Sequence, residues 1–154
     1  MKTLRIYADT SVFGGCFDEE FEQESQKLFD EIRSGRFILV ISETVVEELQ
    51  KAPENVQDVL KSLPIECIEA VVESDKIAEL RDAYIDAGVV GHASLQDAEH
   101  IATASVAEVD LIVSWNFRHI VHFDKIHGYH GVNLLKGYSQ IGIFSPKEVI
   151  NYEE

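Results

Sequence analysis

Three acidic residues stand at positions where a carboxylate could do chemistry. Asp9 directly follows the short apolar run Leu4–Ala8. Glu48 lies in the stretch SETVVEEL, and Asp97 lies in the stretch SLQDAEHIATA. Carboxylates that meet in one cleft repel each other, so a folded protein keeps them together only with a cation or protons present. The three residues are therefore candidates for a site whose negative charge a bound cation would offset.

Each acid also has an ordinary structural explanation when it is considered alone. Asp97 falls in the first turn of an expected helix, where a negative charge complements the helix dipole. Glu47 and Glu48 would both suit the solvated surface of a helix. Asp9 is the hardest to explain in this way, because an aspartate at a strand end could otherwise only begin a turn.

The apolar pattern predicts strands that alternate with helices. Strands are expected at Leu4–Ala8, Phe37–Ile41, Ile65–Ile68, Leu111–Ser114 and Ile141–Phe144. Helices are expected at Phe21–Arg33, from Ser42 to before Pro53, and at Glu54–Ser62, Ser74–Ala87, Leu95–Ala107 and Pro146–Ile150, with a mixed segment up to Tyr138. Near-continuous apolar strands separated by helices indicate a parallel sheet that is covered on both faces. In such sheets the ligands bind outside the carboxyl ends of the strands.

Length and composition suit one α/β domain. The chain has 154 residues, of which 45% are hydrophobic and 27% are charged, as is ordinary for a globular protein. It shows no signal peptide and no apolar stretch near the roughly 20 residues that span a membrane. Its two cysteines, Cys16 and Cys67, lack the CxxC spacing and suit a reducing compartment. We therefore expect a cytoplasmic location and no contact with membranes.

The net charge of −15 is unusual for a protein that acts on nucleic acid, because phosphate contacts normally require a basic surface. The stretch Leu111–Lys136 is the exception: it carries Arg118, Lys125 and four histidines, and Asp124 is its one acid. We expect any contact with RNA to use Arg118 and Lys125.

Four segments together resemble the motifs of the PIN-domain family, which includes the toxin ribonucleases of bacterial toxin–antitoxin pairs. In order along the chain they are YADTSVF, ISETVVEEL, QDAEHIATA and DLIVSWNF. With the alternation between them, the resemblance covers essentially the whole chain. It implies a PIN-like three-layer fold with a roughly five-stranded parallel sheet, and a cluster of acids that binds Mg²⁺ or Mn²⁺ to hydrolyse RNA.

The resemblance also implies a role for each acid. Asp9 would be a direct metal ligand, Asp97 a direct or water-mediated ligand, and Glu48 the residue that orients the attacking water. We prefer Glu48 to Glu47 because the family pattern places its acid directly before an apolar residue, here Leu49.

The chain departs from the family pattern at the fourth acid, where Asn116 stands. An amide can ligate a metal ion or hold its water, but it carries no charge and cannot act as a base, so this departure argues against two-metal chemistry. Asp110 and Asp124 are alternative sources of a fourth acid, although Asp110 precedes its strand and should lie at the opposite end. Ser11 and Ser114 could support the acids by hydrogen bonds, or could have ordinary turn and strand-end roles.

The histidines and the tryptophan leave further alternatives. His119, His122, His127 and His130 lack the spacing of a zinc site, so surface or RNA-facing positions are favoured. His100 follows Asp97 by one helical turn and could either hydrogen-bond it or pack in the core. Trp115 could stack on a base, or lie in the core or at a partner surface.

The leading hypothesis is a Mg²⁺-dependent RNA endonuclease that acts as the toxin of a toxin–antitoxin pair. An antitoxin protein and a second copy of the chain are the other partners that we consider. The alternative is a catalytically weak PIN-like module that binds RNA or protein, which Asn116 and the acidic surface favour. A small-molecule phosphohydrolase is a third option, but the chain lacks a glycine-rich phosphate loop and a second aspartate two residues after Asp9.

Overall fold

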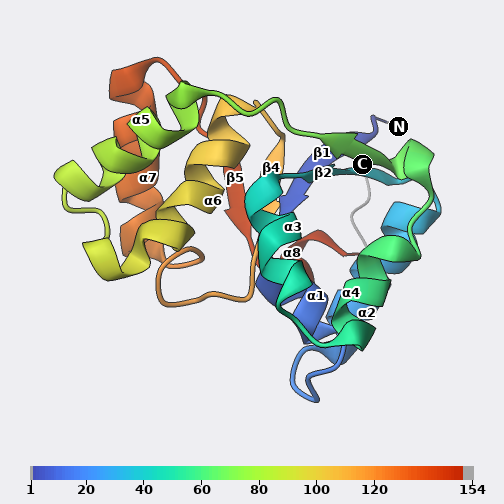
Figure 1. The fold of residues 1–154 in the computed structure, drawn as a ribbon. Helices are drawn as coiled ribbons and strands as arrows, with labels where there is room; N and C mark the ends of the chain where they lie inside the picture. Colours follow the sequence, from blue (N-terminus) through green and yellow to red (C-terminus); the bar gives the residue numbers. More distant parts are fainter. Residues whose placement is uncertain (1, 151–154) are drawn as a thin grey trace.

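Five parallel strands form a central sheet in the computed structural model, which describes residues 2–150 (Figure 1). The strands are β1 (Leu4–Ala8), β2 (Phe37–Ile41), β3 (Ile68–Ala70), β4 (Leu111–Val113) and β5 (Gly142–Phe144). All four neighbouring pairs run parallel. The predicted α/β class and five-stranded parallel sheet are therefore confirmed.

Helices flank the sheet on both sides. They are α1 (Thr10–Gly15), α2 (Glu22–Arg33), α3 (Glu43–Gln50), α4 (Glu54–Lys61), α5 (Asp75–Asp86), α6 (Leu95–Val106), α7 (Phe123–Lys136) and α8 (Pro146–Val149). Helices α5, α6 and α7 pack together on one side of the sheet, and α1, α2 and α4 on the other (Figure 1). In the part of the chain that the structure describes, no helix combines the length and apolarity that crossing a membrane requires.

The central strands are mostly apolar because both faces of their inner parts are covered, whereas Arg5 near the start of β1 is half-buried. Ile6, Tyr7 and Ala8 of β1 and Ile112 and Val113 of β4 expose none of their surface. A strand buried on both faces needs apolar side chains at every position, which is why these strands do not alternate with polar residues.

In the strand order β3-β2-β1-β4-β5, the direction in which the chain adds strands across the sheet reverses between β1 and β4. From β1 the chain moves outward through β2 and β3, and then returns to the other side of β1 with β4 and β5. The backbone N–H of Asp9 donates to the carbonyl oxygen of Val113 at 3.3 Å, so the carboxyl ends of β1 and β4 lie side by side. Such a reversal leaves a crevice at the carboxyl ends of the strands, where ligands bind in open α/β sheets.

One predicted element is misplaced and two helices of the structure were not predicted. The third strand is Ile68–Ala70, and most of its predicted range, Ile65–Cys67, is a 3₁₀ turn. The short helix α1 was not predicted, because its sequence TSVFGG contains β-branched residues and two glycines that disfavour a helix. Helix α7 occupies most of the segment that the pattern left mixed.

Gly15 ends α1 beneath the side chain of Trp115. A Cβ atom at Gly15 would lie 2.6 Å from the hydroxyl oxygen of Ser25 and 2.8 Å from the indole nitrogen of Trp115, both of which are buried. A Cβ atom at Gly14, in the same helix, would meet nothing within 4 Å. The close packing of α1 against the segment after β4 therefore depends on a glycine at position 15.

We predict that Gly15→Ala lowers the free energy of unfolding by about 1–3 kcal/mol, the usual result of overpacking a core. Gly14→Ala is the matched control, and should be neutral or stabilising because alanine favours a helix over glycine by up to about 1 kcal/mol. Denaturant unfolding of the two variants measures the difference. Equal stabilities would contradict the packing described here.

Candidate active site

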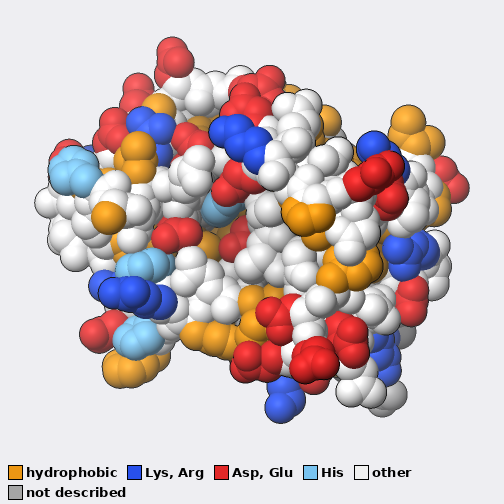
Figure 2. All heavy atoms as spheres, turned by 60° about the horizontal axis from the view of Figure 1, so that its bottom comes forward, with side chains coloured by type: hydrophobic (Ala, Val, Ile, Leu, Met, Phe, Trp, Pro, Cys, Tyr) orange, Lys and Arg blue, Asp and Glu red, His pale blue; other side chains and the backbone are white. Residues whose placement is uncertain are grey.

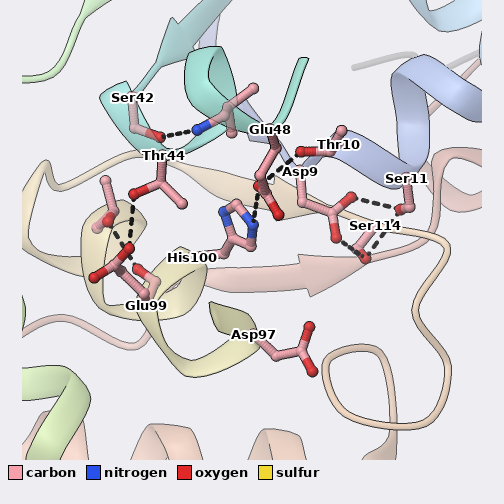
Figure 3. A network of polar contacts seen from close by, with 12 residues as sticks. Asp9, Thr10, Ser11, Ser42, Thr44, Glu48, Asp97, Glu99, His100 and Ser114 are labelled. Atoms are coloured by element: carbon pink, nitrogen blue, oxygen red, sulfur yellow. Dashed lines mark hydrogen bonds and ion pairs between the residues drawn. The ribbon is translucent and has the colours of Figure 1, made fainter. Parts of the chain in front are cut away.

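Asp9 lies at the carboxyl end of β1 and exposes 5% of its surface. Ser11 Oγ donates to its Oδ1 atom at 2.5 Å, and Ser114 Oγ donates to its Oδ2 atom at 2.6 Å (Figure 3). The hydroxyls are oriented in turn, because Ser11 Oγ accepts the backbone N–H of Trp115 and Ser114 Oγ accepts that of Asn116, both at 2.9 Å. Each serine can therefore direct its own proton to Asp9, which favours the ionised carboxylate.

Burial has the opposite effect on Asp9. Loss of contact with water raises the pKa of Asp9 above its ordinary value, and the charge of Glu48 adds to this rise. The nearby His100 and the hydrogen bonds from Ser11 and Ser114 oppose the shift without cancelling it. Asp9 is thus a buried carboxyl group that is oriented by neutral hydroxyls, and a positive charge beside it would favour its ionised form.

Glu48 turns toward Asp9 from helix α3, whereas its neighbour Glu47 is exposed. The helix begins at Ser42, whose side chain accepts the backbone N–H of Val45 at 3.2 Å. Glu48 Oε1 accepts hydrogen bonds from Thr10 Oγ1 at 2.8 Å and from His100 Nε2 at 2.9 Å. Within residues 2–150, Glu48 Oε2 has no hydrogen-bond partner. One oxygen thus holds the side chain in place and the other remains available.

His100 connects Glu48 to the core. The side chain is 3% exposed, and its Nδ1 atom lies 2.7 Å from the hydroxyl of Tyr7, which lies 2.9 Å from Ser42 Oγ. Sequence reasoning had considered a bond between His100 and Asp97, but the structure pairs His100 with Glu48 and Tyr7. The sequence held a partial signal of Tyr7's role. Tyr7 and Asp9 are two residues apart in one extended segment and so point to the same face of the sheet.

The His100–Glu48 contact shifts both pKa values. Burial acts to lower the pKa of His100, but its hydrogen bond to Glu48 and the charges of Asp9, Glu48 and Asp97 outweigh burial and raise it. Burial acts to raise the pKa of Glu48, but hydrogen bonds and charge from His100, with the bond from Thr10, outweigh burial and lower it. Glu48 is therefore ionised at neutral pH.

Asp97 lies in the first turn of α6 and pairs with Asn116. Asn116 Nδ2 donates to Asp97 Oδ1 at 3.0 Å, while Asn116 Oδ1 accepts the backbone N–H groups of Arg118 at 3.2 Å and His119 at 2.9 Å. Desolvation raises the pKa of Asp97, although His119, His100 and Asn116 oppose the shift. An aspartate at position 116 could accept the two backbone bonds but could not donate to Asp97.

Six of the sequence-predicted residues thus meet at the carboxyl edge of the sheet. Hydrogen bonds link Ser11, Asp9, Ser114, Asn116 and Asp97 into one chain, and Glu48 faces it from α3 through Thr10 and His100. Sequence reasoning missed Thr10 and Tyr7, and it did not predict Glu48 as the partner of His100. Their types and positions give little warning of a role, because each acts through a partner that is distant in sequence.

The remaining candidates lie outside this network. Arg118 joins it through its backbone only, and Lys125 has no bond to it. Asp110 lies at the opposite end of the sheet, where it accepts the backbone N–H of Arg5 at 2.8 Å, as its position before β4 had predicted. Asp124 is exposed in the first turn of α7. Neither aspartate replaces the missing fourth acid.

The donor set can be tested against a divalent metal ion. Among residues 2–150, no group of three or more His, Cys, Asp or Glu side chains is arranged to hold a metal. Asp9 and Asp97 offer two part-desolvated carboxylates, and no lysine or arginine forms an ion pair with either of them within the described chain. Mg²⁺ usually binds through one or two carboxylates and completes its shell with water and phosphate oxygens. The oxygen donors of Asp9 and Asp97 are therefore of the chemical type that Mg²⁺ accepts.

Comparison with known proteins does not identify the chain. No family model matches it, and no curated protein matches it.

We predict that Asp9→Asn, without divalent metal, is at least as stable as the wild type at neutral pH. Below pH 3.8, the ordinary pKa of an aspartate, the Asp9 carboxyl group is protonated in both the folded and the unfolded protein. It then contributes nothing to the pH dependence of stability. Above pH 3.8 the Asp9 carboxyl group ionises first in the unfolded chain. The wild type therefore loses stability as the pH rises, until the pH exceeds the raised pKa of Asp9 in the folded protein. Thermal melts at acidic and neutral pH measure this, with the exposed Asp86→Asn as control. An advantage of Asp9→Asn that shrinks as the pH rises would contradict it.

We predict that Asn116→Asp destabilises the metal-free protein by about 1–3 kcal/mol, because the donor to Asp97 is replaced by an unpaired acceptor. Saturating Mg²⁺ should recover the loss, since the added carboxylate strengthens binding of the ion to the folded state. Asn116→Ala also loses the bond to Asp97, together with the two bonds to backbone N–H groups, and adds no charge. If Mg²⁺ raises the melting temperature of Asn116→Asp no more than that of Asn116→Ala, position 116 is not beside the ion.

Proposed function

We propose that the chain is a PIN-type ribonuclease that uses Mg²⁺ or Mn²⁺ to hydrolyse phosphodiester bonds within RNA. The observation that carries the proposal is the meeting of Asp9, Glu48 and Asp97 at the carboxyl ends of β1 and β4. The three acids come from separate elements, and two of them have raised pKa values. Perturbed carboxyl groups that gather at the reversal point of a parallel sheet are typical of a functional site.

Asp9 and Asp97 would hold the ion. When bound, it supplies positive charge for the phosphate and acidifies a coordinated water. Ser11 and Ser114 keep the Asp9 carboxylate in one orientation, and Asn116 does the same for Asp97. These bonds fix both side chains before a substrate arrives, and such preorganisation is a general source of catalytic power.

Glu48 is suited to orient the attacking water and to accept its proton. Its Oε1 atom is held by Thr10 and His100, so Oε2 is the atom that is free to bind water. Its lowered pKa keeps it ionised and therefore able to accept a hydrogen bond from water at neutral pH. His100 and Thr10 are positioning residues in this scheme, because they act through Glu48.

A catalytically weak module that binds RNA or protein is the second candidate. Asn116 favours it, because both polar atoms of its side chain are already engaged in bonds within the protein and a fourth carboxylate is absent from this position. The resemblance to toxin ribonucleases further supports an antitoxin protein as a partner, and this part of the proposal rests on the resemblance alone.

We predict that the purified chain cleaves RNA only with Mg²⁺ or Mn²⁺. Asp9→Asn and Asp97→Asn should abolish cleavage, and Glu48→Gln should slow it by about a hundredfold or more, as expected for loss of a general base. Glu47→Gln is the matched control and should keep full activity, because Glu47 is exposed on the same helix. A gel assay on a panel of structured and single-stranded RNAs measures this. Equal cleavage by Asp9→Asn and wild type would contradict the assigned site, and absence of cleavage by the wild type would favour the binding module.

A further inference from the structure

Two large aromatic rings are exposed in the segment that follows β4. Phe117 exposes 48% of its surface and Phe123 exposes 70%. They are six residues apart, and we call residues 115–125 the aromatic loop. An exposed phenylalanine ring is unfavourable in water, so two exposed rings in the segment that continues from Asn116 suggest a surface that a ligand covers.

The ring of Phe117 rests on a rigid base. The Trp115 ring stacks on Phe21 with centroids 4.2 Å apart, and its indole N–H donates to Ser25 Oγ at 2.8 Å. The Phe117 ring contacts Trp115 edge to face, with centroids 6.1 Å apart. Trp115 is itself 9% exposed, so it belongs to the core and is not the residue that meets a ligand. The exposed ring is Phe117, presented by Trp115.

The ring of Phe123 is also supported. His122 stacks on it with centroids 5.0 Å apart and an angle of 19° between the rings. The Nδ1 atom of His122 accepts the backbone N–H of Asp124 at 3.3 Å, which orients the imidazole. The aromatic loop thus offers two preorganised flat surfaces.

The charge of the loop indicates which ligand it fits. The other four arginines of the chain each form an ion pair with an acid, namely Arg5, Arg33, Arg36 and Arg81. Arg118 is exposed and forms no ion pair within residues 2–150, and the same part of the chain provides none for Lys125. Figure 2 shows basic and histidine side chains beside hydrophobic ones on one part of a face that also carries clusters of acidic side chains. On a chain of net charge −15, free cations beside exposed rings complement an anionic, aromatic ligand.

We propose that the aromatic loop binds a segment of RNA with unpaired bases. Its bases stack on Phe117 and Phe123, and its phosphates contact Arg118 and Lys125. A base within a duplex is already stacked on its neighbours, so exposed rings select bases that are unpaired. Asn116 anchors the loop to Asp97, so a strand bound here leads directly to the acids. The proposal rests on the ribonuclease function proposed above.

Trp115 allows a test by binding alone, because it is the one tryptophan of the chain. In the full-length Asp9→Asn background, its fluorescence is followed while a single-stranded RNA, or a duplex of the same sequence, is added. The single strand should bind more tightly than the duplex. Phe117→Leu and Phe123→Leu should each weaken its binding by about five- to a hundredfold, the range expected for the loss of one stacked base. Phe17→Leu is the matched control and should have no effect, since Phe17 is 49% exposed outside the loop.

Salt titrations add a second readout. Arg118→Gln should reduce the dependence of log affinity on log salt by about 0.7, the contribution of one phosphate contact to a single strand. Arg33→Gln should not, because Arg33 is already paired with Asp30 at 2.8 Å.

Circular dichroism identifies any variant that fails to fold, and the remaining variants then decide the result. Equal losses in Phe117→Leu and Phe17→Leu, equal binding of duplex and single strand, or no binding of RNA at low salt would each overturn the proposal. The last result would leave the loop as a contact for protein. None of these outcomes affects the metal-dependent cleavage assay, in which failure of the ribonuclease function itself would be seen.

Discussion

A carboxylate that is withdrawn from water loses its hydration, and hydrogen bonds or positive charge must replace it. Asp9 is such a carboxylate, and the surrounding fold has to supply these interactions. Ser11 follows β1 and Ser114 follows β4, and each donates a hydrogen bond to the Asp9 carboxylate. They can donate to Asp9 because the backbone N–H groups of Trp115 and Asn116 occupy their acceptor positions. The paired carboxyl ends of β1 and β4 bring these groups together. The sheet topology therefore lowers the free-energy cost of burying Asp9. These hydrogen bonds and the charge of His100 do not cancel the effect of burial on the pKa of Asp9, so a further positive charge beside it would favour its ionised form.

His100 links this site to the core on its other side. It holds Glu48 through one ring nitrogen and contacts Tyr7 through the other, so the position of a candidate catalytic side chain depends on a fully buried strand. Glu48, Asp9 and Asp97 each favour the charged form of His100, while burial opposes it. The acids and the histidine therefore stabilise one another's ionised forms, and a substitution at any of them alters the electrostatics of all. Such coupling is common where a protein accepts some loss of stability to keep a site organised.

Sequence patterns predicted the features that depend on residues close together in the chain. Apolar runs located the central strands, and the position of Asp9 after β1 indicated the edge at which a site would form. Helix α7 was missed because its stability is tertiary: Tyr129 donates to the carbonyl oxygen of His119, and Gly128 lies where a Cβ atom would be 2.8 Å from Val89. A glycine that weakens a helix in isolation is required here for close packing. The bonds of His100 were equally hidden, since they join residues 52 and 93 positions apart.

Asn116 shows how one side chain can join chemistry to recognition. Its amide nitrogen donates to Asp97, and its amide oxygen closes the turn that carries Phe117 and Arg118. A carboxylate could perform the second task but would repel Asp97, and a lysine could perform the first but has no acceptor for the turn. An amide is suited to both, because it carries a donor and an acceptor on one rigid plane. At the position where the resemblance implies a fourth acid, Asn116 therefore provides a fixed connection between Asp97 and the aromatic loop.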